Sequence, residues 1–223
     1  MKVSELVSLR VVDPAMKEWD LKDLMEELRQ TAGIREVIVL PANLRRVKQL
    51  LAGTGIRIGT VIDYPLGCGT VAKKAFEVGH SFQDGAEFLE LSISSDILLH
   101  QPAMIRELDL ALSPLSIAWG EIRTRVDSRE LPELTKIDLA AAMRELGWSW
   151  LVLGEGADIE TAKHDATTFE YDGGKKLRLQ VNLESATQEE LQELLLRGVD
   201  RVGLSSLAGL DLTYELHQTE ADV

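Results

Sequence analysis

The sequence predicts an α/β fold, a TIM (β/α)8 barrel formed by one domain over residues 1–223. Three observations lead to this prediction. Short runs rich in Val, Ile and Leu recur along the chain, as expected of strands that are buried on both faces of a parallel sheet. Amphipathic stretches separate most of these runs, and parallel strands need such crossovers. The chain lacks both a Gly-x-Gly-x-x-Gly fingerprint and a Walker-type phosphate loop, which disfavours an open doubly wound sheet.

The predicted strands cover residues 6–12, 37–40, 56–62, 88–93, 115–119, 148–153, 177–183 and 199–204, and none of them contains a lysine. Helical spacing of apolar residues is clearest at Leu21, Leu24, Met25 and Leu28. Thr187 and Glu190 have the spacing of a capping box at a helix start. The acidic stretch 155–174 has no strong apolar stripe, and we expect a loosened helix or a loop over the barrel mouth there.

Composition limits the classes of partner. A net charge of −13 argues against a nucleic-acid interface and against docking on anionic lipid. Cys68 is the one cysteine, so no internal disulfide forms and a reducing, cytoplasmic location is expected. No apolar stretch reaches the length of a membrane span, and no signal peptide is recognisable.

Three stretches carry a resemblance to a known family. They read GTGIRIGTVIDYPLG at 53–67, AFE with DGAEFLE at 75–77 and 84–90, and GVDRVGLSS at 198–206. In this order and spacing they resemble deoxyribose-phosphate aldolase, and the resemblance runs from about residue 6 to about residue 207. It implies a class I aldolase on a (β/α) barrel, acting without metal or other cofactor on acetaldehyde and glyceraldehyde 3-phosphate.

The catalytic groups that this resemblance implies are replaced. The family forms a Schiff base on a lysine, whose pKa a second lysine lowers, with a third lysine and two aspartates assisting. Carried over position by position, these groups fall on Val152, Gln180, Ser116, Glu90 and Ser8. The resemblance therefore implies a divergent member without the catalytic lysines, and no residue is assigned a catalytic role.

The phosphate site of the family is altered as well. Ser205 and Ser206 remain, but Glu184 and Glu155 stand in the two glycine-rich loops, where carboxylates would repel a phosphate. The candidate ligand-binding residues at the mouth are Arg10, Asp63, Glu90, Glu121, Gln180, Asn182, Gly203, Ser205 and Ser206.

Several of these residues have a structural alternative. Glu90 and Glu121 form an acid/base pair or bind a divalent metal in one interpretation, and pair with arginines in the other, which we favour. No histidine is placed to support a metal site. Cys68 is interpreted as incidental rather than nucleophilic. We expect Trp119, Trp148 and Trp150 to fill core rather than to stack on a ligand.

The favoured function is a pseudoenzyme with a binding, regulatory or scaffold role, whose partner is a small polar ligand, another protein or a second copy of the chain. An enzyme with carboxylate-based chemistry at the same mouth is the first alternative. An active deoxyribose-phosphate aldolase is the second. Fold alone does not decide among the three.

Overall fold

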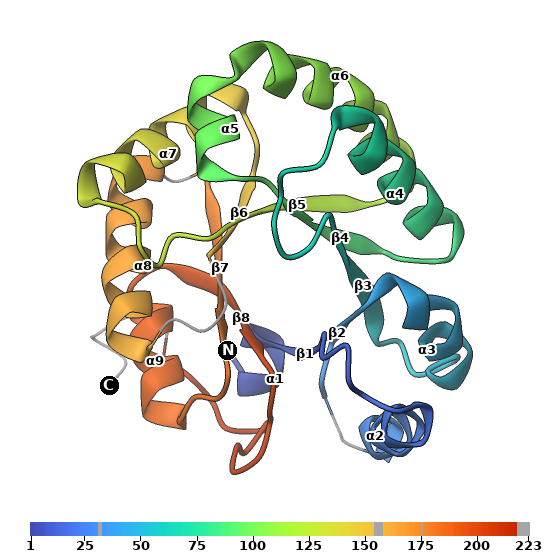
Figure 1. Ribbon diagram of the computed structural model, residues 1–223. Helices are drawn as coiled ribbons and strands as arrows, with labels where there is room; N and C mark the ends of the chain where they lie inside the picture. The colour runs from blue at the N-terminus through green and yellow to red at the C-terminus, as the bar shows by residue number, and fades with distance from the viewer. Residues whose placement is uncertain (31–32, 154–157, 175, 218–223) are drawn as a thin grey trace.

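The computed structural model describes residues 1–30, 33–153, 158–174 and 176–217. Eight parallel strands pair in sequence order and close into a barrel, with β1 next to β8. Helices surround the barrel on its outside (Figure 1). The predicted TIM barrel is therefore confirmed.

The strands are β1 Val7–Val11, β2 Glu36–Val39, β3 Arg57–Ile62, β4 Phe88–Ser92, β5 Glu121–Val126, β6 Trp150–Leu153, β7 Arg178–Leu183 and β8 Val199–Leu204. The helices are α1 Val3–Leu6, α2 Glu18–Gln30, α3 Leu44–Leu50, α4 Val71–Gln83, α5 Ser95–His100, α6 Pro102–Trp119, α7 Glu133–Leu146, α8 Ile159–Gly173 and α9 Gln188–Leu196, with a 3-10 turn, η1, at Pro41–Asn43.

Every predicted strand overlaps an observed one except 115–119. That segment is the last turn and a half of α6, and the strand follows it as β5. Ile117 and Trp119 are largely exposed, and of the large apolar residues of this run only Leu115 packs against the core. The stretch 155–174 contains the regular helix α8, while residues 154–157 lie outside the described residues.

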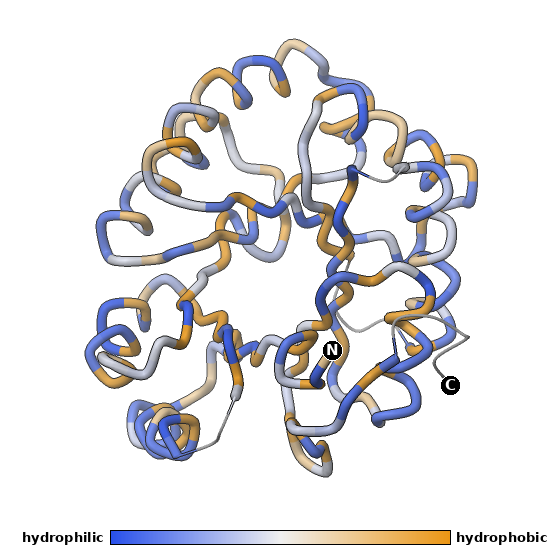
Figure 2. Tube along the Cα trace, turned by 180° about the vertical axis from the view of Figure 1, so that it is seen from behind, coloured by the Kyte–Doolittle hydropathy of each residue, from blue (hydrophilic) through white to orange (hydrophobic). Residues whose placement is uncertain are grey.

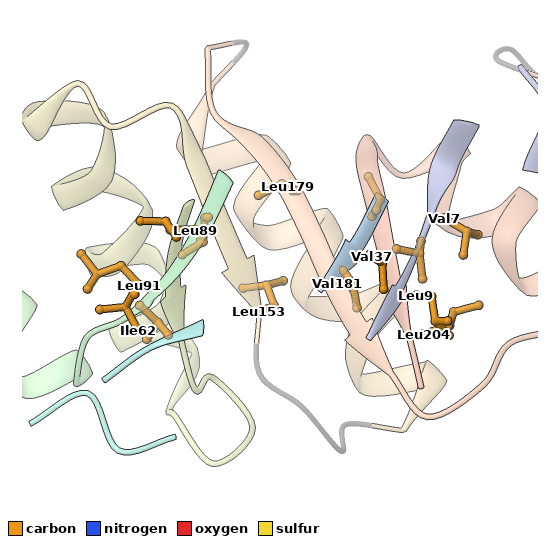
Figure 3. Close-up of a cluster of buried hydrophobic side chains, with 14 of the residues drawn as sticks. Val7, Leu9, Val37, Ile62, Leu89, Leu91, Leu153, Leu179, Val181 and Leu204 are labelled. Atoms are coloured by element: carbon orange, nitrogen blue, oxygen red, sulfur yellow. The ribbon is translucent and has the colours of Figure 1, made fainter. Parts of the chain in front are cut away.

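The main hydrophobic core lies between the sheet and the helices. It contains the outward-facing side chains of the strands, among them Leu9, Val37, Leu89, Leu153 and Leu204 (Figure 3). These meet the apolar faces of helices such as α2, α7 and α9. Seen from behind in Figure 2, hydrophilic segments are concentrated on the outer helices. Burial of this apolar layer is the dominant stabilising term of the fold.

A second, smaller apolar cluster lies inside the barrel and contains Ile38, Val61 and Phe88. Val12, Leu40 and Tyr64 pack against it from the segments that follow β1, β2 and β3. The rest of the barrel interior is mostly polar, and this polar interior is where the candidate site lies.

Candidate functional site

Glu90 on β4 is fully buried at the centre of the barrel. Arg10 on β1 and the amide nitrogen of Gln180 on β7 both donate hydrogen bonds to its carboxylate. The Gln180 amide also donates to Asn182 Oδ1 at 3.0 Å, while its oxygen accepts from Arg123 Nη1 at 2.8 Å. Four predicted site residues, Arg10, Glu90, Gln180 and Asn182, are thus brought into one hydrogen-bonded network.

The position expected to hold the Schiff-base lysine lies beside this network. Val152 is fully buried on β6, and its neighbours in register are Arg125 on β5 and Gln180 on β7. Ser8 on β1 is also buried, and its hydroxyl donates to Glu36 at 3.0 Å. The side chains at these positions offer no amine, so none of them can form an imine with an aldehyde.

The assignment of Ser116 to the third lysine is wrong. Ser116 lies on α6 outside the barrel, because the strand that the lysine would open begins at Glu121. The fully buried cation near the start of this strand is Arg123, which reaches Gln180 across the barrel. A guanidinium remains charged at neutral pH and therefore does not replace an amine as a nucleophile.

Glu36 and three arginines close the N-terminal end of the barrel. Arg123 donates to both carboxylate oxygens of Glu36 at 2.9 and 3.0 Å, and Arg57 donates at 2.7 Å. Arg201 approaches to 3.5 Å. Burial works to raise the pKa of Glu36, but the charge and hydrogen bonds of Arg123, with Arg201 and Arg57, hold it below the usual value.

Guanidinium groups and aromatic rings alternate across the same end. Arg178 lies over the ring of Trp150 at 4.7 Å, and Arg123 lies over the same ring at 4.5 Å. Arg123 also lies 4.2 Å from the ring centroid of Phe88, and Arg57 lies 5.1 Å from that centroid. These cation–π contacts make the N-terminal end a packed closure. Trp150 fills core as expected, whereas Trp119 is exposed.

Glu121 belongs to this closure and not to the mouth. It accepts a hydrogen bond from Arg123 Nε at 2.7 Å and from the indole nitrogen of Trp150 at 2.8 Å. Glu90 is occupied by Arg10 and Gln180. Both carboxylates therefore contact arginines, as in the interpretation that the sequence favours, and this geometry does not support a Glu90–Glu121 acid/base pair.

Asp63 stands at the opposite, C-terminal end of the barrel, in a left-handed conformation with φ of 50°. Lys73 and Lys74, from the first turn of α4, both donate to its carboxylate, and the Gly69 amide donates at 2.7 Å. Burial opposes these contacts, yet together they hold the pKa of Asp63 below its usual value. Asp63 is thus fully engaged within the protein.

Lys73 is a lysine on α4 at the rim of the barrel mouth. Its hydrogen bond to Asp63 raises its pKa above the usual value. A Schiff-base lysine needs the opposite shift, because only the neutral amine attacks an aldehyde. Lys74, the second lysine that contacts Asp63, is completely buried and also donates to the carbonyls of Gly67 and Ser92.

Arg125 is a site residue that the sequence analysis missed. It is buried near the C-terminal end of β5, where it donates to Pro65 O at 3.1 Å and contacts Ser92 Oγ at 3.4 Å. Burial, together with the nearby charge of Arg10, lowers its pKa from the usual value. The sequence does contain a pattern that predicts this position. Glu121, Arg123 and Arg125 alternate along the chain, and alternate residues of a strand lie on one face of the sheet.

The amides expected to hold a phosphate are occupied by the protein itself. Ser205 N donates to the carbonyls of Leu183 and Glu184 at 3.2 and 3.1 Å. Ser206 N donates to the same Glu184 carbonyl at 3.0 Å. The backbone donors of this turn are therefore engaged in joining the β7 and β8 loops.

A cleft of about 450 Å³ opens beside this turn at the mouth. Its lining includes Arg10 and Ser205, the apolar Val12 and Leu183, and the carboxylate residue Glu184. Gly203 allows Arg10 to reach the cleft. A Cβ at Gly203 would lie only 2.6 Å from Arg10 Cδ and 2.3 Å from Asn182 Oδ1, so any larger residue would displace the network.

The remaining candidates do not join the network. Cys68 is exposed on the β3–α4 loop, and its thiol donates a hydrogen bond to the Leu66 carbonyl at 3.3 Å. Glu155 lies outside the described residues. Within the described ranges no cluster of His, Cys, Asp or Glu has the arrangement of a metal site. No helix of the described part is long and apolar enough to cross a membrane.

The fold and the site together define a closed (β/α)8-barrel protein with a charged, hydrogen-bonded interior and a cleft at the C-terminal ends of its strands. In this fold class the functional groups lie at that end. No protein-family model matches the chain.

The chain resembles deoxyribose-phosphate aldolases over nearly its whole length. It is 23% identical over 206 residues to the deoxyribose-phosphate aldolase of Clostridium botulinum strain Langeland, covering 92% of this chain and 97% of the relative. The Caldicellulosiruptor saccharolyticus enzyme of the same name is 24% identical over 192 residues, covering 84% of this chain and 86% of the relative.

Solved structures share the fold. QR15, an aldolase, superposes with a TM-score of 0.79 at 16% identity, covering 92% of this chain and 91% of that one. A deoxyribose phosphate aldolase from Aeropyrum pernix, described as a unique tetramer, gives 0.76 at 17% identity, with 92% and 87% covered. These likenesses support the aldolase-like barrel that the sequence predicts.

Proposed function

We propose that this aldolase-like barrel has lost Schiff-base chemistry and acts as a binding, regulatory or scaffold protein. The observation that carries the proposal is the absence of lysine from all eight strands, whose inward positions hold Arg10, Arg123 and Val152 instead. The single cysteine favours a cytoplasmic location.

The buried lysines support the same conclusion. Lys74, Lys136 and Lys163 lie on outer helices, and each forms an ion pair with a carboxylate. Each of these amines is engaged by a carboxylate, and none of them lies on a strand of the barrel. The engaged amides of Ser205 and Ser206 further argue against recognition of a sugar phosphate.

Borohydride trapping with acetaldehyde tests the loss of Schiff-base chemistry. We expect intact-mass spectra without a reduced acetaldehyde adduct, while the Clostridium botulinum relative, treated in parallel, serves as the positive control. A stoichiometric adduct that maps to Lys73 or Lys74 by peptide analysis would contradict the proposal, because these two lysines donate to Asp63 at the mouth.

A thermal-shift comparison tests the binding role. We expect 2-deoxyribose 5-phosphate to stabilise the fold no more than inorganic phosphate at the same concentration does, whereas a ligand of the mouth cleft stabilises the fold by mass action. A screen of unphosphorylated sugars and small acids, and co-purification from the native cell, separate a small-molecule ligand from a protein partner. Saturable stabilisation by the sugar phosphate beyond that given by inorganic phosphate would favour an active aldolase instead.

A further inference from the structure

We propose a binding site for a phosphate group in a cleft at the N-terminal end of the barrel, opposite the mouth. The cleft has a volume of about 590 Å³ and lies between the end of α2, the start of β2 and the turn from α3 to β3. Its lining includes three arginines, Arg29, Arg35 and Arg57, together with the glycines Gly53 and Gly55.

Each of the three guanidinium groups has N–H groups that donate no hydrogen bond to the described residues. Arg29 Nη1 donates to the Leu50 carbonyl at 2.6 Å and to the Ala52 carbonyl at 3.5 Å. Arg35 uses Nη2 for Glu5, and Arg57 uses Nη1 for Glu36. Within the described ranges, the other terminal nitrogen and Nε of each arginine donate no hydrogen bond. A guanidinium edge with two parallel N–H groups matches a phosphate.

The charges in the cleft favour an anion. Arg35 and Arg57 each have one carboxylate partner, whereas Arg29 has none among the described residues. Three cations thus face two carboxylates. Arg29 and Arg35 are exposed and Arg57 is about 40% exposed, so an anion can reach all three without unfolding the barrel.

The turn at Gly53, Thr54 and Gly55 adds backbone donors. Both glycines have left-handed conformations, with φ of 81° and 76°. The N–H groups of Gly53 and Gly55 donate no hydrogen bond in the part of the chain that the structure describes. A Cβ built at either glycine meets nothing within 4 Å, so this side of the turn is open. Unpaired amides beside cations form the concave environment in which phosphates bind.

A single phosphate group fits this cleft better than a polyanion does. The donors belong to Arg29 on α2, to Arg35 just before β2, to Arg57 at the start of β3 and to the glycine turn, an arrangement that suits a compact tetrahedral dianion. An extended nucleic acid would also meet the rest of a surface whose net charge is −13. The ligand class is therefore a small molecule that bears a phosphate group.

Titration with inorganic phosphate, followed by amide NMR, tests the proposal on the whole chain. We expect saturable shifts of the Gly53 and Gly55 amides that sodium chloride of equal ionic strength does not produce. Arg29→Gln and Arg35→Gln should each weaken binding about tenfold, as expected for the loss of a charge-assisted hydrogen bond.

Arg45→Gln is the matched control, because Arg45 is an exposed arginine on α3 that pairs with Asp84 away from the cleft. It should bind phosphate as the wild type does. Non-saturating shifts equal to those in sodium chloride, an equal loss in Arg45→Gln, or shifts confined to Gly203, Ser205 and Ser206 would overturn the proposal. Because Arg29 and Arg35 are exposed, their substitution tests the site even if Arg57→Gln fails to fold.

Discussion

At the scale of single residues, Val152 is the position that we predict to correspond to the Schiff-base lysine of the aldolases that the chain resembles. It is fully buried, with Arg125 and Gln180 as its register neighbours. A lysine placed here would be desolvated and close to a fixed cation. Both effects favour the neutral amine, which is the form that attacks an aldehyde.

We therefore expect Val152→Lys to gain a reduced acetaldehyde adduct under borohydride, with intact mass as the measurement. Val152→Met, which adds length without an amine, should gain none. Circular dichroism establishes that both variants are folded. A folded Val152→Lys protein without adduct would show that the aldehyde does not reach the barrel centre.

Arg123 is a buried cation with three hydrogen-bond partners, Glu36, Glu121 and Gln180. Arg123→Met should destabilise the fold by about 3–5 kcal/mol in urea unfolding, because a buried carboxylate loses its bidentate partner. Arg129→Met removes an exposed pair with Asp127 and should cost less than about 1 kcal/mol. Equal losses in the two variants would mean that the interior network contributes no more than a surface pair.

The site could be predicted from the sequence only where strand alternation places residues. Arg10, Glu90, Gln180 and Asn182 fall on inward positions of strands that the sequence identifies, and they do meet. The partnership of Glu36 with Arg123 joins residues 87 positions apart across the barrel. Hydrophobic periodicity carries no information about such pairs, so the sequence predicts arginine–carboxylate pairing in general but does not identify Glu36 as the partner of Arg123.

At the scale of elements, β5 shows why one strand was misplaced. The inward face of β5 carries Glu121, Arg123 and Arg125, and three charged residues in such a short segment predict an exposed loop rather than a buried strand. The neighbouring segment 115–119 is apolar, so its composition predicts a buried strand instead. The rule that buried parallel strands are continuous apolar runs assumes that both faces of the strand are surrounded by apolar side chains. A barrel filled with ion pairs breaks that assumption on one face.

The β3–α4 loop is fixed by one lysine. The Lys74 amine donates to Asp63 and to the carbonyls of Gly67 and Ser92, joining the loop to β4. Lys74→Met should speed amide hydrogen exchange in 64–69 by about tenfold or more, since each charged hydrogen bond contributes about 1.5–3 kcal/mol. Lys73→Met, at a half-exposed position, is the control and should change exchange less. Unchanged exchange in Lys74→Met would contradict this role.

At the scale of the whole molecule, the barrel interior links stability to pH. The pKa of Glu36 is lower in the folded state than its usual value of 4.5. The stability that this shift contributes is therefore complete above about pH 4.5 and is lost as the pH falls through the folded pKa.

Glu36→Gln should accordingly be less stable than the wild type at pH 7, and the difference should shrink as the pH falls below about 4.5. Urea unfolding between pH 7 and pH 3 measures it. Glu26→Gln, at an exposed position on α2, should follow the wild-type curve. A Glu36→Gln deficit that stays constant across this range would show that Glu36 does not contribute through its ionisation.

The whole fold was predictable because seven connections join successive parallel strands, and few topologies can accommodate that many connections between apolar strands. The eighth contact of the ring, between β8 and β1, has no crossover. Besides the pairing of the two strands, it is fastened by a clasp in which Val3 N donates to Tyr214 O, Ser4 N to Leu212 O, and Leu216 N to Met1 O. Under mechanical load applied between residues 1 and 217, these few backbone bonds would be strained first, and the ring would open at its seam before any helix-connected pair of strands separated.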